Sequence, residues 1–252
     1  MSNKNIHMPF YNYSGNSETI IIFIHGILES PAQFKPLAKL ALSKGYSISA
    51  ILLDGHGKSG EDFANSSLEK WINCVNKEIE KHKDKNIILV GHSMGATLSI
   101  LSYVNHKNNI KGIVAISTPM YVRVKANIAI SSIKIALGKI DENDIFTNHA
   151  YNAFSVDRSS LLTYFRWMPR YIDLFKLISR SRNLLSDIDV PMLVIHAMND
   201  ELVSHRSLNL FKNLKNYNKI IKLQNSGHFY YDEKDLDYLC NELRVFLDDI
   251  KK

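Results

Sequence analysis

The stretch "NIILVGHSMGAT" (Asn86–Thr97) joins an apolar run to a serine between two glycines. The run is typical of a strand buried on both faces, and a helical pattern follows it. Gly91-His92-Ser93-Met94-Gly95 therefore fits G-x-S-x-G at a strand-to-helix turn. The turn strains the serine backbone, and the glycines allow neighbouring elements to approach closely. This context favours a nucleophilic Ser93 over a serine that only caps a helix.

The serine needs a base, and His92 is its neighbour in sequence. Consecutive side chains diverge in a tight turn, so we expect His92 to pack sideways and not to reach the hydroxyl. For this type of turn the chain order is serine, acid, histidine. His228 in "NSGHFYYD" follows the last expected strand, and Gly227 allows its loop to turn back. His228 is the predicted base, although a surface loop histidine would give the same pattern.

The acid that orients the base is predicted to be Asp200. It lies in "HAMNDELVS", four residues beyond an expected strand that ends at His196. A helix cap is its alternative role. Asp187 and Asp189 are rivals, but they precede that strand and so belong at the opposite edge of the sheet.

Two backbone amides are expected to stabilise the negative oxygen that forms during acyl transfer. One is the N–H of Met94, directly after the nucleophile. The other is the N–H of Ile27 in "HGILES", where Gly26 permits close approach, although "HG" could also be a simple turn. Each such donor contributes roughly 3–4 kcal/mol to transition-state stabilisation.

Strand and helix patterns alternate along the chain, which predicts a parallel sheet covered by helices on both faces. The expected strands are residues 19–25, 46–53, 86–92, 111–117, 190–196 and 219–224. Helices are expected over residues 31–44, 94–104 and 232–250. Another should begin near residue 204, and a further one is predicted by the capping-box spacing of Ser66 and Glu69 at its start.

Residues 119–187 break this rhythm and have a helical pattern. We expect them to form a cap inserted into a core made of residues 1–118 and 188–252. Apolar side chains of the cap should lie near the mouth of the site and limit the length of an acyl pocket: Phe146, Phe154, Phe165, Trp167, Met168 and Phe175.

Composition restricts the class of protein. The chain has 252 residues, 45% hydrophobic and 22% charged, as in a globular domain, and no run long enough to span a bilayer. With no apolar leader, it is expected to be cytoplasmic. The net charge of +6 comes from lysines scattered among acids, which disfavours nucleic-acid binding.

Metal and nucleotide sites are also disfavoured. Cys74 and Cys240 stand alone, and no histidines have metal-ligand spacing. "GHGKSG" (55–60) is not a phosphate loop, because position 52 is leucine and the motif needs glycine there. We expect neither a metal nor a cofactor.

The segments "FIHGILESPAQF", "VGHSMGA", "MNDELVS" and "SGHFYYDE" occur in an order that resembles the α/β-hydrolase superfamily. Within it the chain is similar to small bacterial carboxylesterases and monoacylglycerol lipases. The resemblance implies an α/β fold, with a mostly parallel sheet, helices on both faces and a helical cap. It also implies Ser93, Asp200 and His228 as triad, with Ile27 and Met94 as amide donors.

These predictions together indicate a serine esterase that acts on small-molecule esters of short to medium acyl chains through an acyl-enzyme. The same residues suit a thioesterase, an acyltransferase or a hydrolase of carbon–carbon bonds. A slow-turnover ligand receptor of this fold is a further alternative. A haloalkane dehalogenase is disfavoured because it would need aspartate at position 93.

Overall fold

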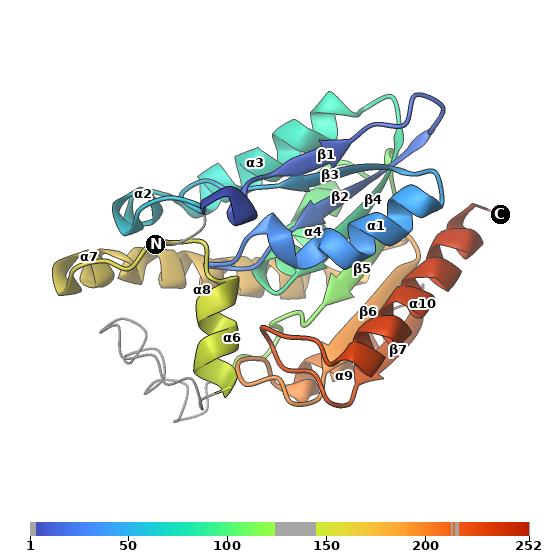
Figure 1. The fold of residues 1–252 in the computed structure, drawn as a ribbon. Coiled ribbons are helices and arrows are strands. Elements are labelled where there is room, and N and C mark those ends of the chain that lie inside the picture. Colours follow the sequence, from blue (N-terminus) through green and yellow to red (C-terminus); the bar gives the residue numbers. More distant parts are fainter. Residues whose placement is uncertain (1–3, 124–144, 213, 215–216, 252) are drawn as a thin grey trace.

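The computed structural model describes residues 4–123, 145–212, 214 and 217–251. Seven strands form one sheet in the order β1-β3-β2-β4-β5-β6-β7, and β1 is antiparallel to its neighbour while the others run parallel (Figure 1). The strands are β1 Phe10–Asn12, β2 Thr19–Ile24, β3 Ser47–Ile51, β4 Asn86–His92, β5 Ile110–Ile116, β6 Met192–Ala197 and β7 Tyr217–Leu223.

Strand β2 explains why the sheet is covered on both faces. Its sequence TIIIFI is apolar throughout, and alternate side chains point to opposite faces. Ile22 packs in one buried cluster and Phe23 in another. Helices α1 (Lys35–Ser43) and α10 (Glu233–Ile250) cover the Phe23 face, whereas α3 (Leu68–Lys81), α4 (Met94–Asn105) and α8 (Met168–Asn183) cover the Ile22 face (Figure 1).

The six predicted strands are confirmed, each within two residues at either end. The shorter elements are η1 Lys4–His7, η2 Pro31–Phe34, α2 Gly60–Ala64, α6 Ile145–Ala153, α7 Leu161–Arg166, η3 Leu185–Asp187, η4 His205–Ser207 and α9 Leu208–Phe211. The predicted capping box is wrong by one residue. Ser67 caps α3 through the amide of Lys70, while the Ser66 hydroxyl donates to the Asp54 carbonyl.

The two glycines around Ser93 are required by close packing. A methyl group on Gly95 would collide with the carbonyl oxygen of Ile24, and one on Gly91 would collide with the first turn of α4. Helix α4 therefore begins directly against β2. The serine between them has φ 52°, in the left-handed region that few residues other than glycine adopt.

The topology places these residues at the point where the sheet reverses its winding. From β2 the chain passes to β3 on one side, and β4 then lies on the other side of β2. Ligands of open α/β sheets bind in the crevice at the carboxyl ends of such strands. The loop after β2 and the turn after β4 therefore meet at the expected site.

Between β5 and β6 the described chain forms α6, α7, α8 and η3. Helix α8 belongs to the same core as the sheet, because Leu177 is fully buried there and the Ser181 hydroxyl donates to the Thr97 carbonyl of α4. Trp167 binds the carbonyl of Gly60 through its indole N–H. The predicted insertion also includes residues 124–144 and the side chain of Phe146, which lie outside the described residues. No helix among the described residues is long and apolar enough to cross a membrane.

Candidate active site

Ser93 forms the turn between β4 and α4. Its φ of 52° and ψ of −119° are strained for a residue with a side chain, and the surrounding packing holds them. Its amide donates to the carbonyl of Ile116 on β5, which fixes the turn to the neighbouring strand. The side chain is nearly buried, with 6% of the residue exposed. This geometry is that of the predicted nucleophile turn.

Three predicted residues from distant parts of the chain meet here. Nε2 of His228 lies 3.1 Å from Oγ of Ser93, and Nδ1 lies 2.8 Å from Oδ2 of Asp200. Asp200 Oδ1 accepts the amides of Leu202 and Val203, which orients its carboxylate. The structure thus forms a continuous chain of hydrogen-bonding groups from the serine to the acid.

The charges around His228 determine its basicity. Burial of the imidazole lowers its pKa, but the charge of Asp200, the hydrogen bond to it and the charges of Glu29 and Glu201 together outweigh burial and raise the pKa to about 8. Burial raises the pKa of the Asp200 carboxyl, whereas His228 and the two amides lower it to about 2. Asp200 therefore stays ionised at neutral pH and stabilises a protonated His228.

The loop after β2 is held by a network of its own. The Gly26 amide donates to Oε2 of Glu29 (2.8 Å), the Glu29 amide donates to the Gly26 carbonyl, and the Leu28 amide donates to Nε2 of His56 (3.1 Å). The Ile27 amide lies in sequence between the amides of Gly26 and Leu28, which both donate to side chains. Met94 is the first residue of α4, where an amide has no partner within its own helix. The assignment of Ile27 and Met94 as donors stays a prediction.

His92 does not serve Ser93. Its Nδ1 lies 2.8 Å from Oε2 of Glu29, and both residues are almost completely buried. Because an ionised carboxylate has no proton to give, His92 is the donor in this pair. The expectation that His92 points away from the serine agrees with this contact.

Three side chains at the site were missed in the sequence: His25, Glu29 and His56. The imidazoles of His25 and His56 are buried and accept amide protons of Leu53 and Leu28, so they brace the loops. Burial, the dominant cause, lowers their pKa values to about 4 and about 3. A signal for Glu29 was present, since it is the one acid in "HGILES", directly after an expected buried strand, and an acid buried there needs a partner.

A hollow of about 390 Å³ borders His228. Its walls come from η2, from α6 and from the loop that carries His228, and they include the polar side chains Ser30, Gln33, His149 and Asn152. His149 stacks on Tyr230, and Phe154 packs edge-on against Phe229. The segment around α6 therefore lies against the His228 loop.

None of the predicted apolar side chains that the structure describes lines this hollow. Phe165, Met168 and Phe175 are 74%, 54% and 55% exposed on the outside of α7 and α8. Trp167 is buried against Phe63 of α2. Placing all of them at the mouth of the site was wrong, because the buried side of α8 is occupied by its contact with α4. Among those described, Phe154 lies against the loop of His228, through its contact with Phe229.

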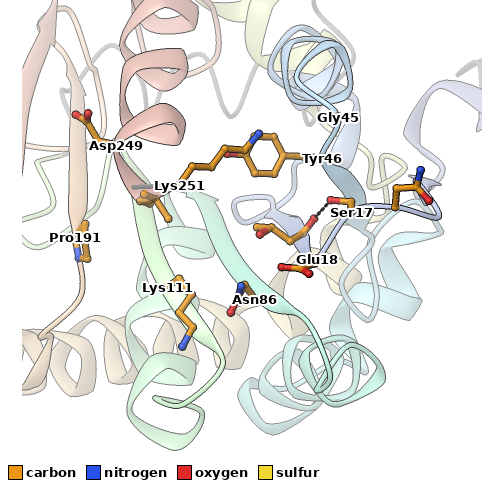
Figure 2. A pocket seen from close by; sticks show the side chains of 12 residues that line it. Ser17, Glu18, Gly45, Tyr46, Asn86, Lys111, Pro191, Asp249 and Lys251 are labelled. Carbon is orange, nitrogen blue, oxygen red and sulfur yellow. Dashed lines mark hydrogen bonds between the residues drawn. The ribbon is translucent and has the colours of Figure 1, made fainter.

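A larger hollow, of about 670 Å³, lies at the opposite edge of the sheet (Figure 2). It is lined by residues at or next to the amino ends of β2, β4, β5 and β6, such as Asn86 and Pro191. Charges of both signs surround it, including Lys111, Glu18 and Asp249. It contains none of the residues that meet at Ser93.

Glu29, His92 and His228 bring three possible metal-ligand atoms within 4.8 Å of one another. The geometry does not favour a metal there. Nδ1 of His92 is committed to Glu29, and Nε2 of His228 faces the Ser93 hydroxyl. A metal would compete with both contacts.

Comparison of the sequence and the fold with known proteins shows which family and which structures this chain is similar to. The family model described as serine aminopeptidase, S33, matches residues 15–233. The thermostable monoacylglycerol lipase of Bacillus sp. strain H-257 is 25% identical over 87% of this chain and 86% of its own. Human monoglyceride lipase is 24% identical over 93% and 82%. The crystal structure of the Paleococcus ferrophilus monoacylglycerol lipase superposes with a TM-score of 0.69 at 18% identity, covering 95% and 98%. The fold is that of the α/β hydrolases, as predicted.

Proposed function

The chain belongs to the family described as serine aminopeptidase, S33, and within it we propose a serine esterase with Ser93 as nucleophile, His228 as base and Asp200 as orienting acid. Its curated relatives are named as lipases and esterases, which supports an ester-hydrolysing enzyme. The observation that carries the proposal is the chain of contacts from Ser93 through His228 to Asp200, at 3.1 and 2.8 Å.

Each residue of the proposed triad has a role in the reaction. His228 takes the proton of Ser93 as Oγ attacks the ester carbonyl, and the carbonyl oxygen becomes an oxyanion held by the Ile27 and Met94 amides. The protonated His228 then gives its proton to the leaving alcohol, which leaves an acyl group on Ser93. Water, deprotonated by the same imidazole, releases the acid and restores the serine. Asp200 remains ionised throughout.

The substrate we propose is an ester of a short to medium acyl chain, including monoacylglycerols. The hollow beside His228, which has both polar and apolar walls, supports this choice, because the leaving alcohol departs on the side of the base. Gln33 and Asn152 line that hollow and offer hydrogen bonds to a hydroxylated alcohol such as glycerol. We further propose that α6 and Phe154, which lie against the His228 loop, belong to a cap over this site.

Turnover of p-nitrophenyl butyrate and of a monoacylglycerol by the wild type and by Ser93→Ala tests the proposal. We expect steady multiple turnover by the wild type and a loss of several orders of magnitude in the variant. A single slow turnover would favour a ligand receptor instead. Faster turnover of matched thioesters would favour a thioesterase, and product transfer to an added alcohol would favour an acyltransferase. An aminoacyl p-nitroanilide is the control for peptidase activity, and we expect no hydrolysis of it.

A further inference from the structure

The base has a second carboxylate beside it. Oε1 of Glu29 lies 3.8 Å from Nε2 of His228, on the nitrogen that exchanges a proton with Ser93. The Glu29 and His228 side chains are 3% and 2% exposed. A separation of 3.8 Å is too long for a hydrogen bond, so Glu29 acts on the imidazole through its charge and does not take its proton.

The other oxygen of Glu29 fixes this arrangement. Oε2 accepts from the Gly26 amide at 2.8 Å, from Nε2 of Gln33 at 2.6 Å and from Nδ1 of His92 at 2.8 Å. Gly26 belongs to the loop of the expected oxyanion donor, and His92 belongs to the nucleophile turn. Oε2 thus connects the loop after β2 to the turn of Ser93 by hydrogen bonds, and Oε1 faces Nε2 of His228.

We propose that Glu29 is a positioning residue for the reaction, which holds a buried negative charge beside Nε2 of His228 and joins the loop of Ile27 to the turn of Ser93. The proposal rests on the proposed function of Ser93 and His228. It assigns to Glu29 a share in stabilising the protonated base, in addition to that of Asp200.

Other groups also face the imidazole. They are Asp200, Glu201 and His196 at the end of β6 and in the loop after it, and His92 at the end of β4. Tyr231, which is partly buried, faces Glu29 and Asp200. Glu201 differs from Glu29 in its contact, since its Oε2 accepts the backbone amide of His228 at 2.9 Å. Glu201 is therefore a suitable control, because it is a second acid that contacts His228 but does so at the backbone and not at Nε2.

Glu29→Gln isolates the charge. The amide oxygen can take the place of Oε2 and keep its three donors, and the amide nitrogen replaces the oxygen that faces His228. We expect the rising limb of kcat/KM against pH to move down by about one pH unit, with a smaller movement in Glu201→Gln. We also expect a lower plateau at high pH, because the protonated base is less stabilised. An NMR titration of the His228 ring in Ser93→Ala, with and without Glu29→Gln, should show the same downward shift.

The NMR titration separates this proposal from the function itself. If the wild type hydrolysed no ester, the proposed function would fail, yet the His228 titration would still report on Glu29. A uniform loss of rate with an unmoved midpoint in both measurements would show that Glu29 is merely structural. A shift in Glu201→Gln as large as that in Glu29→Gln would also overturn the proposal.

A separate observation concerns the outer surface of α7 and α8. Six large apolar side chains are 52% to 74% exposed there: Leu161, Leu162, Phe165, Met168, Ile172 and Phe175. Trp167 between the helices has φ −77° and ψ −17°, close to helical values, so the helical rotation continues through it. Five of the six recur at spacings of four and three residues and form one stripe. Helix α8 buries its opposite side, with Leu177 and Ser181.

The exposed charges within residues 158–186 are all basic, and one of them, Arg166, is paired with Glu61 of α2. Arg158, Arg166, Lys176, Arg180 and Arg182 are exposed along the same segment. Asp173 is the sole acid between residues 158 and 186, and it is buried and paired with Arg170. A second copy of this chain would bring like charges together across the stripe. An apolar stripe flanked by Lys and Arg instead fits the surface of an anionic bilayer.

We propose that the apolar stripe of α7 and α8 docks on the surface of an anionic lipid bilayer. Helix α7 lies at the edge of the molecule, at the left in Figure 1, where a flat surface can reach it. The proposal needs no membrane-spanning helix, since the apolar side chains enter only the interface.

Co-sedimentation with vesicles tests it. We expect the wild type to bind phosphatidylcholine vesicles that contain phosphatidylglycerol, to bind pure phosphatidylcholine poorly, and to dissociate as salt is added. Phe165→Ser with Phe175→Ser should abolish binding, whereas Val245→Ser, at an exposed valine of α10, should not. No binding, or equal binding to both vesicles, would overturn the proposal. A dimer that dissociates in the double variant would assign the stripe to a second copy.

Discussion

Nδ1 of His228 lies 2.8 Å from Oδ2 of Asp200, although 28 residues separate them in sequence. The loop after β6 presents the acid, and the loop after β7 presents the imidazole. Since β6 and β7 are parallel neighbours, their carboxyl ends bring the two loops together. This pairing supports Asp200 as the proposed orienting acid and contributes to the raised pKa of His228.

Asp200→Asn should lower kcat by roughly 10⁴-fold, because the amide no longer favours the correct tautomer and no longer stabilises the protonated imidazole. Steady-state kinetics on a p-nitrophenyl ester checks this. Asp187→Asn and Asp189→Asn are the controls, since both residues precede β6 at the other edge of the sheet. A large loss in either control, with Asp200→Asn nearly unaffected, would refute the acid assignment.

The reaction should depend on one ionisation near pH 8. His228 must be neutral to accept the serine proton, and its pKa is raised to about 8, so kcat/KM should rise as pH increases through that value. At pH 6 it should be roughly one-hundredth of the plateau. A pH–rate profile with chemistry rate-limiting checks this, and a flat profile from pH 5 to 8 would contradict a histidine base.

His92→Asn should keep activity within about tenfold of the wild type, because His92 contacts Glu29 and not Ser93. His228→Asn should instead lose roughly 10⁵- to 10⁶-fold, as loss of a triad base does elsewhere. The same ester assay compares the two. If the losses were reversed, His92 would have to be the base.

Substrate length should show an optimum. Each buried methylene of the acyl chain gains about 0.8 kcal/mol, nearly fourfold in kcat/KM, until the pocket is full. A p-nitrophenyl ester series from acetate to palmitate should therefore rise and then fall. A continuous rise through palmitate, with activation by lipid emulsions, would favour a true lipase of long chains.

The turn at Ser93 could be predicted because its signals are local. The apolar strand, the two glycines and the start of the following helix all lie within twelve residues, and the glycines have a steric reason. The six predicted strands were also found from local signals, because each is a short apolar or β-rich run, although β3 and β7 include polar residues. Strand β1, whose three residues carry no such run, was not predicted.

The contacts of Glu29 could not be predicted from the sequence. Its pairing with His92 joins residues 63 positions apart, and only the positions of β2 and β4 side by side bring them together. The exposed face of α7 and α8 was missed for a related reason. The periodicity of Phe165, Met168 and Phe175 indicates one helical face, but it does not say whether that face meets the sheet or solvent.

Labelling with a fluorophosphonate, followed by intact mass and peptide mapping, tests the assignment of the nucleophile most directly. The reagent reacts with a serine only where a base activates the hydroxyl. We predict one adduct per chain, located on Ser93, and no adduct in Ser93→Ala or His228→Asn. An unlabelled wild type, an adduct on another residue, or persistent labelling of Ser93→Ala would contradict the account.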